Sequence, residues 1–363
     1  MRSWRRQPDR PAAAALFAAQ PAALLRAPHR FTSQVWRVIL ERACSASRPG
    51  QRADGHMVCL AIEGGGMRGA VSAGMCVILE AAGLIDAFDR IYGVSAGALN
   101  GCAAAAGQAA FSATYYQDAA SRRVINPIRP LVRRPLVDFD FLFEELISAR
   151  KPLSFDGLAH GPEFRALATS VETLTLRVLG GFAELEELML AVRASATLPR
   201  LGGRPPIFRG EAMIDGGLVE PIPFATPIAE GATHVLVLRS RPAGYRRPPL
   251  AGLGDSFAIH GDTRLFSLVK ARTAVYNSQA DALERATRRR GSGPHVEQVA
   301  VPDGTRLIAR LDANPERVVD ALRLGAKTMA STILEEPIDL CWQPVVYRSS
   351  AEHDDARADA AQS

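Results

Sequence analysis

The sequence predicts an α/β protein of three layers, in which helices cover both faces of a mostly parallel central sheet. Apolar runs of strand length alternate with helical segments, and this order is typical of parallel sheets because each crossover needs a connecting helix. Residues 57–62 form the first apolar run, which ends in glycines before a predicted helix over residues 70–82. Residues 90–93 form a second short strand before an alanine-rich helix over residues 96–106.

The same alternation resumes in the second half of the chain. Strand-like stretches occupy residues 174–179, 211–214 and 234–238. Helical stretches occupy residues 184–194, 227–230, 264–290 and 314–333. The last helix has Asn314 and Pro315 at its start, which suits an N-cap followed by the first helical position. Residues 239–254 are rich in proline and glycine, so we expect an irregular loop there.

Composition excludes several protein classes. The chain has 363 residues, of which 47% are hydrophobic and 22% charged, as in a globular protein with a sizeable core. Its longest uncharged apolar stretches fall well short of the roughly 18 residues of a membrane-spanning helix. Prolines interrupt the alanine-rich N-terminus, which argues against a signal peptide. Five cysteines without a CxxC pair indicate neither a disulfide framework nor a zinc site. We therefore expect a cytoplasmic protein.

Positive charge is concentrated at the N-terminus. Residues 1–56 contain ten arginines and three acidic residues, whereas the rest of the chain is close to neutral. We expect residues 1–55 to form a basic, partly disordered arm, either solvated or in peripheral contact with anionic lipid headgroups. A short helix predicted over residues 33–46 has Val35, Trp36, Ile39 and Leu40 on one face, which could rest on lipid, pack on the body or bind a partner. Nucleic acid is not an expected partner, because the body lacks a basic stripe with interleaved aromatics.

A glycine-rich motif follows the first strand. Residues 63–69 read EGGGMRG and match GxGxxG between a strand and a helix. This pattern also describes a dinucleotide-binding turn, for which Asp86 and Asp89 would be the ribose ligands. A phosphate-binding loop of the P-loop type is excluded because Ala70 stands where a lysine is needed.

A second motif favours nucleophilic catalysis. Gly93, Ser95 and Gly97 form a GxSxG pentapeptide between a strand and a helix. In that context the sharp turn lifts the serine hydroxyl out of the sheet and places it near a helix N-terminus, where positive potential favours a developing anion. Small residues are needed two positions before and two positions after the serine because the backbone passes close to its neighbours.

With Ser95 as nucleophile, the glycine motif acquires a different role. Gly64, Gly65 and Gly66 can present backbone N–H groups to a tetrahedral oxyanion without side chains in the way. Arg68 would anchor this loop or add positive potential. The simpler alternative is that the run from Gly64 to Gly69 only closes a tight strand-to-helix turn.

The serine also needs a base. Of the seven histidines, His260 is the best candidate for a Ser-Asp-His triad. Asp215 is the stronger candidate, because it follows a strand-like stretch and precedes Gly216 and Gly217, which allow its carboxylate to approach another backbone closely. Asp-Gly is, however, also a common turn dipeptide.

Taken together, the three motifs resemble the patatin-like phospholipase family, specifically bacterial patatin-domain lipid acyl hydrolases. That family has a GGGx[RK]G oxyanion loop, a GxSxG elbow and a DG[GA] motif, and they occur here in the same order. Residues 194–199 resemble the small-residue helix end before the family's aspartate, and residues 221–223 its proline-containing stretch after it. The resemblance covers residues 57–240.

The resemblance implies a patatin-like α/β/α hydrolase with a Ser95–Asp215 dyad that cleaves acyl esters of lipids through an acyl-enzyme, with no metal or cofactor. Its oxyanion loop would comprise Gly64, Gly65, Gly66, Arg68 and Gly69. Phospholipid is the implied substrate, and a small-ester esterase or triacylglycerol lipase would use the same dyad. Two further functional classes stay open, namely a cofactor-binding protein that uses the glycine loop and a non-catalytic lipid-binding protein.

The predicted organisation places the catalytic domain at residues 57–240, a helical extension of the same fold at 241–348 and a disordered tail at 349–363. Within the catalytic domain, residues 137–147 are a candidate cover for an acyl pocket, although their phenylalanines could equally be core. Arginines just upstream are candidate contacts for anionic headgroups, namely Arg122, Arg123, Arg129, Arg133 and Arg134.

Overall fold

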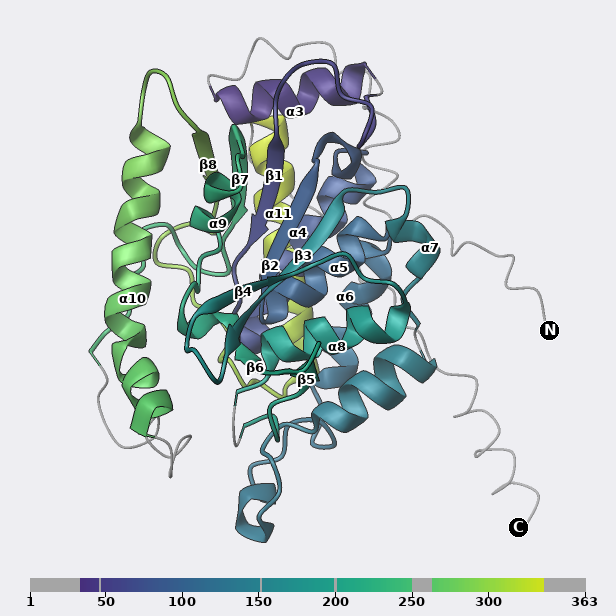
Figure 1. Cartoon of the computed structure of the whole chain (residues 1–363), viewed down its shortest axis with the longest axis vertical. Coiled ribbons are helices and arrows are strands. Elements are labelled where there is room, and N and C mark those ends of the chain that lie inside the picture. The colour runs from purple at the N-terminus through teal and green to yellow at the C-terminus, as the bar shows by residue number, and fades with distance from the viewer. Residues whose placement is uncertain (1–32, 46, 151, 199–200, 250–262, 336–363) are drawn as a thin grey trace, which may run out of the picture.

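The central sheet is the structural frame of the protein (Figure 1). The computed structural model describes residues 33–45, 47–150, 152–198, 201–249 and 263–335. Within them the strands follow the spatial order β5-β6-β3-β2-β1-β7-β8, and β4 pairs with β3. The strands are β1 (Val58–Ile62), β2 (Arg90–Val94), β3 (Glu163–Ser170), β4 (Leu176–Leu179), β5 (Ile207–Phe208), β6 (Glu211–Asp215), β7 (His234–Leu238) and β8 (His295–Val299).

The sheet is mostly parallel, which confirms the predicted fold class. β2 and β7 flank β1, and both pair with it in parallel. β3 extends the parallel part beyond β2, and β8 extends it beyond β7. The antiparallel strands β4 and β6 both pair with β3, so they are confined to one side of the sheet. All five residues of β1 are buried, as expected for a central strand covered on both faces.

Helices cover both faces of the sheet. Val58, Leu60 and Ile62 of β1 belong to one core cluster, whereas Cys59 and Ala61 belong to another on the opposite face. The first face packs against α4 (Gly69–Ala81), α5 (Ala96–Ala105), α6 (Ala109–Ala119), α8 (Leu185–Ala196) and α11 (Pro315–Leu334). The second face packs against α10 (Thr263–Arg288), with the short α9 (Ala225–Ala229) nearby. This is the expected three-layer arrangement. Among the described residues, none of the helices combines the length and the apolar character needed to span a bilayer.

Helix α3 (Gln34–Cys44) packs on the body of the protein. Its apolar face, including Trp36 and Ile39, is buried, so the alternatives in which this face rests on lipid or binds a partner are wrong. Residues 1–32 of the predicted arm lie outside the described residues.

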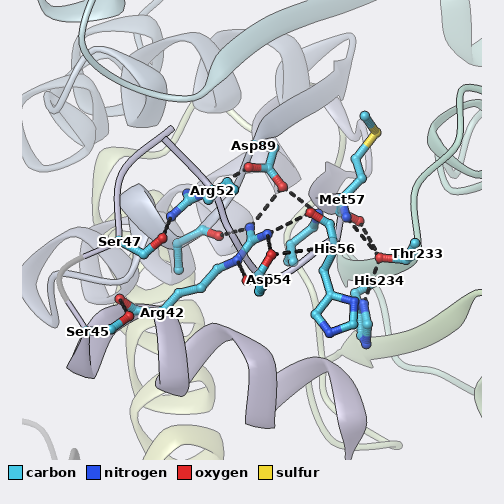
Figure 2. A network of polar contacts seen from close by, with 12 residues as sticks. Arg42, Ser45, Ser47, Arg52, Asp54, His56, Met57, Asp89, Thr233 and His234 are labelled. Atoms are coloured by element: carbon cyan, nitrogen blue, oxygen red, sulfur yellow. Dashed lines mark hydrogen bonds and ion pairs between the residues drawn. The ribbon is translucent and has the colours of Figure 1, made fainter. Parts of the chain in front are cut away.

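Arg42 fixes α3 and the following segment to the start of the sheet (Figure 2). The Arg42 guanidinium is only 2% exposed and donates to both carboxylate oxygens of Asp54, at 2.7 and 2.9 Å. It also donates to Asp89 at 2.8 Å and to the carbonyl oxygen of His56 at 2.7 Å. Helix α3 and the segment that ends at His56 are therefore tied to the domain by partly buried charge-assisted hydrogen bonds, which are stronger than those between neutral groups.

Three strands of the sheet are missing from the sequence prediction, namely β3, β5 and β8. The C-terminal extension is not only helical, because β8 extends the sheet beside β7. β3 lies next to β2 and contacts the carboxyl-terminal residue of β6. Residues 336–348 of the extension and the predicted tail lie outside the described residues.

Candidate active site

Ser95 lies on a strained turn between β2 and α5. Its backbone has φ 57° and ψ −127°, a conformation that is sparsely populated for residues other than glycine. A Cβ atom on Gly97 would lie 2.3 Å from the carbonyl oxygen of Ile62, and one on Gly93 would lie 2.4 Å from that of Gly97. The predicted need for small residues on both sides of Ser95 therefore has a direct steric cause.

The end of α8 holds this turn in place. Ser195 is fully buried, and its Oγ accepts a hydrogen bond from the amide nitrogen of Ser95 at 2.9 Å. The same hydroxyl donates to the carbonyl oxygen of Leu167 in β3 at 2.6 Å. Two residues later, the carbonyl oxygen of Thr197 accepts from the amide nitrogen of Asp215 at 2.8 Å. One helix end thus positions both members of the predicted dyad.

The glycine loop lies directly against the nucleophile. A Cβ atom on Gly64 would lie 2.9 Å from the Cβ of Ser95. Among the described residues, the N–H groups of Gly64 and Gly65 meet no hydrogen-bond acceptor. Gly66 has φ 59°, a left-handed conformation that favours glycine, and it turns the chain into α4. This geometry suits an oxyanion-binding loop.

One member of the glycine motif, Gly69, differs from the prediction. The N–H of Gly69 donates within the turn to the carbonyl oxygens of Gly66 and Met67, so it is not available to an oxyanion. A Cβ on Gly69 would lie 2.4 Å from the Tyr116 hydroxyl, which makes this a packing position at the start of α4. The side chain of Arg68 lines a cavity beside Ser95, so its positive charge lies close to the nucleophile.

Asp215 ends β6 and is buried. Burial raises the pKa of its carboxyl group above the ordinary value, while hydrogen bonds from the Gly217 N–H and the Ser95 side chain act in the opposite direction. The Gly217 N–H lies 2.8 Å from Asp215 Oδ1. Gly216 brings the turn close to β3, because a Cβ there would lie 2.3 Å from the carbonyl oxygen of Leu167. The structure therefore brings the two predicted dyad residues together.

A buried ion pair holds the start of the glycine loop in place. Arg239 Nε lies 3.0 Å from Glu63 Oε2, and both side chains are almost completely buried. The Tyr276 hydroxyl donates to Glu63 Oε1 at 2.8 Å, and the backbone N–H of Ser240 donates to Glu63 Oε2 at 2.9 Å. The Ser240 hydroxyl then donates to the carbonyl oxygen of Gly64 at 2.7 Å. This network fixes the start of the glycine loop to the loop after β7.

A large, mainly apolar cavity opens beside Ser95 and Asp215. It has a volume of about 1720 Å³. Its apolar lining includes Leu99, Tyr115, Phe139, Leu142, Phe143 and Val192. The candidate cover segment thus forms part of the wall of this cavity, while Phe141 and Phe143 also belong to the core. Of the upstream arginines, Arg129, Arg133 and Arg134 line the cavity.

A smaller cavity adjoins the same two residues and is rich in arginine. It has a volume of about 40 Å³. Five arginines line it, namely Arg68, Arg241, Arg247, Arg272 and Arg310. Its two carboxyl groups are Asp215 and Glu63, and Glu63 is already paired with Arg239. The site therefore combines an apolar side and a strongly positive side, with Ser95 at both.

The arginines of the smaller cavity repel one another. Burial, followed by the charges of Arg241 and Arg310, lowers the pKa of Arg68 to about 9. Arg68 is 8% exposed, and its Nε has no hydrogen-bond partner among the described residues. Burial and neighbouring arginines likewise lower the pKa of Arg247 to about 10. An anion in this cavity would relieve that repulsion.

The match to known proteins agrees with this geometry. Residues 60–228 match the model of a family described as Patatin-like phospholipase. This part of the chain belongs to the patatin-like phospholipase family. The glycine loop, the Ser95 turn and Asp215 all fall inside the matched residues, whereas β7, β8, α10 and α11 of the patatin-like fold follow them.

Individual relatives are distant. An uncharacterized protein of Escherichia coli strain K12, YjjU, is 27% identical over 191 residues, which are 51% of this chain and 52% of that protein. The chain thus spans about half the length of this curated relative. VipD from Legionella pneumophila has a TM-score of 0.38 at 14% identity, over 78% of this chain and 68% of that one. Human GIVD cytosolic phospholipase A2, in complex with methyl gamma-linolenyl fluorophosphonate, has a TM-score of 0.43 at 13% identity, over 87% and 63%.

The alternative of a dinucleotide-binding turn is wrong in this patatin-like fold. Asp89 precedes β2 and bonds to Arg42 and Arg52 at the amino end of the sheet, whereas the glycine loop follows the carboxyl end of β1 (Figure 2). Asp86 pairs with Arg48 in the same region. Neither carboxylate can contact a ribose held at the glycine loop.

The triad candidate His260 lies outside the described residues. Among the described residues, no group of three or more His, Cys, Asp or Glu side chains could hold a metal ion.

Sequence reasoning missed the residues that support the site from other elements. Arg239 and Tyr276 stand far from the motifs along the chain, so no local pattern indicates that they meet Glu63. Ser195 belongs to a stretch that the family resemblance identifies, but nothing in the sequence shows that its hydroxyl bonds to the nucleophile's amide.

Proposed function

We propose that this protein is a lipid acyl hydrolase of the phospholipase A type, in which Ser95 is the nucleophile and Asp215 the base. The observation that carries the proposal is the strained Ser95 turn, which faces the N–H groups of Gly64 and Gly65 on one side and a buried aspartate on the other. Backbone strain at such a position is typical of functional sites. Membership of the patatin-like phospholipase family supports the same activity.

In the proposed reaction, Ser95 Oγ attacks the ester carbonyl carbon while its proton passes to Asp215. The N–H groups of Gly64 and Gly65 donate to the oxyanion of the tetrahedral intermediate. Asp215 then gives the proton to the leaving oxygen, which departs as an alcohol and leaves an acyl group on Ser95. Water transfers a proton to Asp215, attacks the acyl carbonyl, and releases the fatty acid as Ser95 regains its proton. The raised pKa of Asp215 favours this exchange, because a more basic carboxylate accepts a proton more readily.

The two cavities support a phospholipid substrate over a neutral ester. The large apolar cavity suits an acyl chain. The small cavity suits a phosphate, because guanidinium groups bind phosphate through paired charge-assisted hydrogen bonds. Its volume of about 40 Å³ is a few times the space that one water requires, roughly 10 to 15 Å³, so a group the size of a phosphate is compatible with it. A triacylglycerol or a small neutral ester would supply no anion to this cavity.

Fatty-acid release from phosphatidylglycerol, triolein and p-nitrophenyl butyrate tests the proposal. We expect phosphatidylglycerol to be hydrolysed fastest, and we expect Ser95→Ala and Asp215→Asn to abolish release from all three. A chelator should change none of these rates. Activity that survives in Ser95→Ala would contradict the assigned nucleophile.

A matched pair of variants tests the arginine cavity. Arg247→Gln should reduce phospholipid hydrolysis more strongly than ester hydrolysis. Arg246→Gln is the control, because Arg246 pairs instead with Asp281 and Glu284, each at 2.7 Å. An equal effect of the two substitutions on the phospholipid-to-ester ratio would favour the esterase or neutral-lipase alternative.

A further inference from the structure

A loop at the mouth of the large cavity exposes both apolar and basic side chains. Residues 126–136, here named the arginine loop, leave the body where Ile125 and Val137 form an antiparallel bridge. The N–H of Asn126 donates to the carbonyl oxygen of Leu136 at 3.0 Å and closes the base of the loop. The loop extends away from the body at the bottom of the view in Figure 1.

The tip of the arginine loop is apolar and exposed to solvent. Ile128 is 61% exposed, Leu131 83% and Val132 65%. These are three of the six large hydrophobic side chains that are exposed among the described residues. Exposed apolar groups gathered in one short segment are unusual on a free surface and typically mark a contact with a membrane or another molecule.

Charge narrows the choice of partner. The arginine loop contains three arginines and no acidic residue. Arg129 pairs with Asp138 at the base of the loop. Arg133 and Arg134 are exposed, and neither forms an ion pair with another described residue. Free positive charge beside an apolar tip complements a surface that is anionic outside and apolar inside, which is the profile of an anionic bilayer.

The loop is shaped to present this tip. Successive backbone hydrogen bonds run from Leu131 to Ile128 and from Arg133 to Pro130 within a short 3₁₀ helix, Arg129–Val132. Prolines at positions 127, 130 and 135 further restrict the backbone. Because the loop is already ordered, its apolar tip can enter a bilayer without a large loss of conformational entropy.

The position of the loop relative to the cavity supports a lipid surface over a protein partner. Pro130, Arg133, Arg134 and Pro135 line the large cavity, which also contains Ser95. Whatever binds the loop therefore faces the entrance to the apolar cavity. A bilayer supplies both the surface that the loop complements and acyl chains that the cavity fits.

We infer that the arginine loop docks this protein on anionic membranes, with Ile128, Leu131 and Val132 inserted among the lipids and Arg133 and Arg134 on the headgroups. That the membrane also supplies the substrate rests on the function proposed above. Docking itself is independent of catalysis, so the two can fail separately.

Vesicle sedimentation of the full chain carrying Ser95→Ala tests the docking without consuming lipid. We expect binding to vesicles of phosphatidylcholine with 30 mol% phosphatidylglycerol, and much weaker binding to phosphatidylcholine alone. Leu131→Asp with Val132→Asp should weaken binding at least tenfold, since burial of one leucine side chain contributes about that factor. Ile207→Asp is the matched control, because Ile207 is 58% exposed on β5 and outside the loop. Equal binding by these two variants would overturn the proposal.

A second pair of variants tests the charges. Each arginine near an anionic surface contributes about fivefold in affinity, so Arg133→Glu with Arg134→Glu should weaken binding by more than twentyfold. Arg289→Glu with Arg290→Glu changes two adjacent exposed arginines directly after α10 and should change binding little. If both pairs weaken binding equally, overall charge and not the loop is responsible, and the proposal is wrong.

Two further readouts separate docking from hydrolysis and from folding. Leu131→Trp should give a blue-shifted emission component with anionic vesicles, and Ile207→Trp should not. In protein with Ser95 intact, Leu131→Asp with Val132→Asp should hydrolyse soluble p-nitrophenyl butyrate at the wild-type rate, because neither side chain lines the cavity. If no variant hydrolyses any ester but the vesicle results hold, the proposed function fails and the docking surface stands. If wild type binds no vesicle, the docking proposal is wrong.

Discussion

The hydroxyl of Ser195 lies 2.9 Å from the amide nitrogen of Ser95 and accepts its hydrogen bond. This contact joins α8 to the nucleophile turn across one hundred residues of sequence. Because Ser195 also donates to Leu167 in β3, it connects the strained turn to both a helix and the sheet. The conformation of Ser95 is therefore maintained by tertiary contacts and not by the local sequence alone.

Replacement of Ser195 by alanine should both destabilise the protein and slow hydrolysis. The change removes the acceptor of the Ser95 N–H and one donor to the Leu167 carbonyl oxygen, and a buried N–H left unsatisfied costs about 1–3 kcal/mol. The rate should fall because the turn is less firmly held, while the nucleophile and base remain present. Chemical denaturation and ester hydrolysis measure the two effects. Ser112→Ala is a control, because that buried hydroxyl donates to the carbonyl oxygen of Ala109 in its own helix; a similar loss of rate there would contradict the assigned role.

Two inactive variants should differ in stability. Ser95→Ala and Ser95→Gly both remove the hydroxyl, but only glycine relieves the strain of φ 57° and ψ −127°. Strain of this kind costs about 1–3 kcal/mol, so Ser95→Gly should be more stable than Ser95→Ala by up to that amount. Urea denaturation at neutral pH measures the difference. If Ser95→Gly is instead less stable than Ser95→Ala, the extra conformational entropy that glycine gives the unfolded chain outweighs the relief of strain in the folded protein.

Asp215 should set the acid limit of activity. Only the ionised carboxylate can act as a base, so kcat/KM should fall as pH decreases through a pKa above the ordinary value for aspartate. Because the folded protein binds this proton more tightly than the unfolded chain, the stability that Asp215 contributes decreases as pH rises through its pKa. Asp215→Asn should therefore be inactive, and its free energy of unfolding relative to wild type should increase from pH 4 to pH 7. A variant that is progressively less stable over that range would refute the raised pKa.

His234 should make the protein sensitive to mild acid. Burial, followed by the nearby His56 and His295, lowers the pKa of His234 to about 4, against an ordinary value of 6.5. The unfolded chain is protonated first as pH falls, so stability is lost between about pH 6.5 and pH 4. The shift corresponds to about 3 kcal/mol at most. We expect the stability advantage of wild type over His234→Gln to shrink across this range in denaturation experiments.

The sequence predicts the parts of the site that local rules control. Few backbone conformations suit a strand that ends in glycines or a serine that stands between small residues. The loop at Gly64 and the turn at Ser95 are therefore recognisable from their residues alone. Asp215 is identifiable because its Asp-Gly-Gly context and the family resemblance agree, and the structure places it beside Ser95. The assignment of an oxyanion role to Gly69 is wrong, because that residue begins α4 and its N–H donates to the carbonyl oxygens of Gly66 and Met67.

Other features depend on contacts that no short pattern encodes. β3 begins with Glu163 and Arg165, and β8 carries Glu297 and Gln298, so neither strand has the continuous apolar character of β1. Their place in the sheet is decided by neighbouring strands. The arginines of the small cavity likewise come from the glycine loop, the loop after β7, α10 and the segment before α11. Their convergence becomes visible only when the chain is folded.

The place of β1 in the sheet decides how the protein can be divided. The matched residues 60–228 end before β7, yet β7 pairs with β1 along all five residues. They also omit α11, which covers α4. A fragment cut at the family boundaries would lose Val58 and Cys59 and leave the rest of β1, a fully buried strand, as an unprotected sheet edge, and such apolar edges pair with other chains and aggregate. Recombinant fragments intended for study should therefore run from α3 to the end of α11.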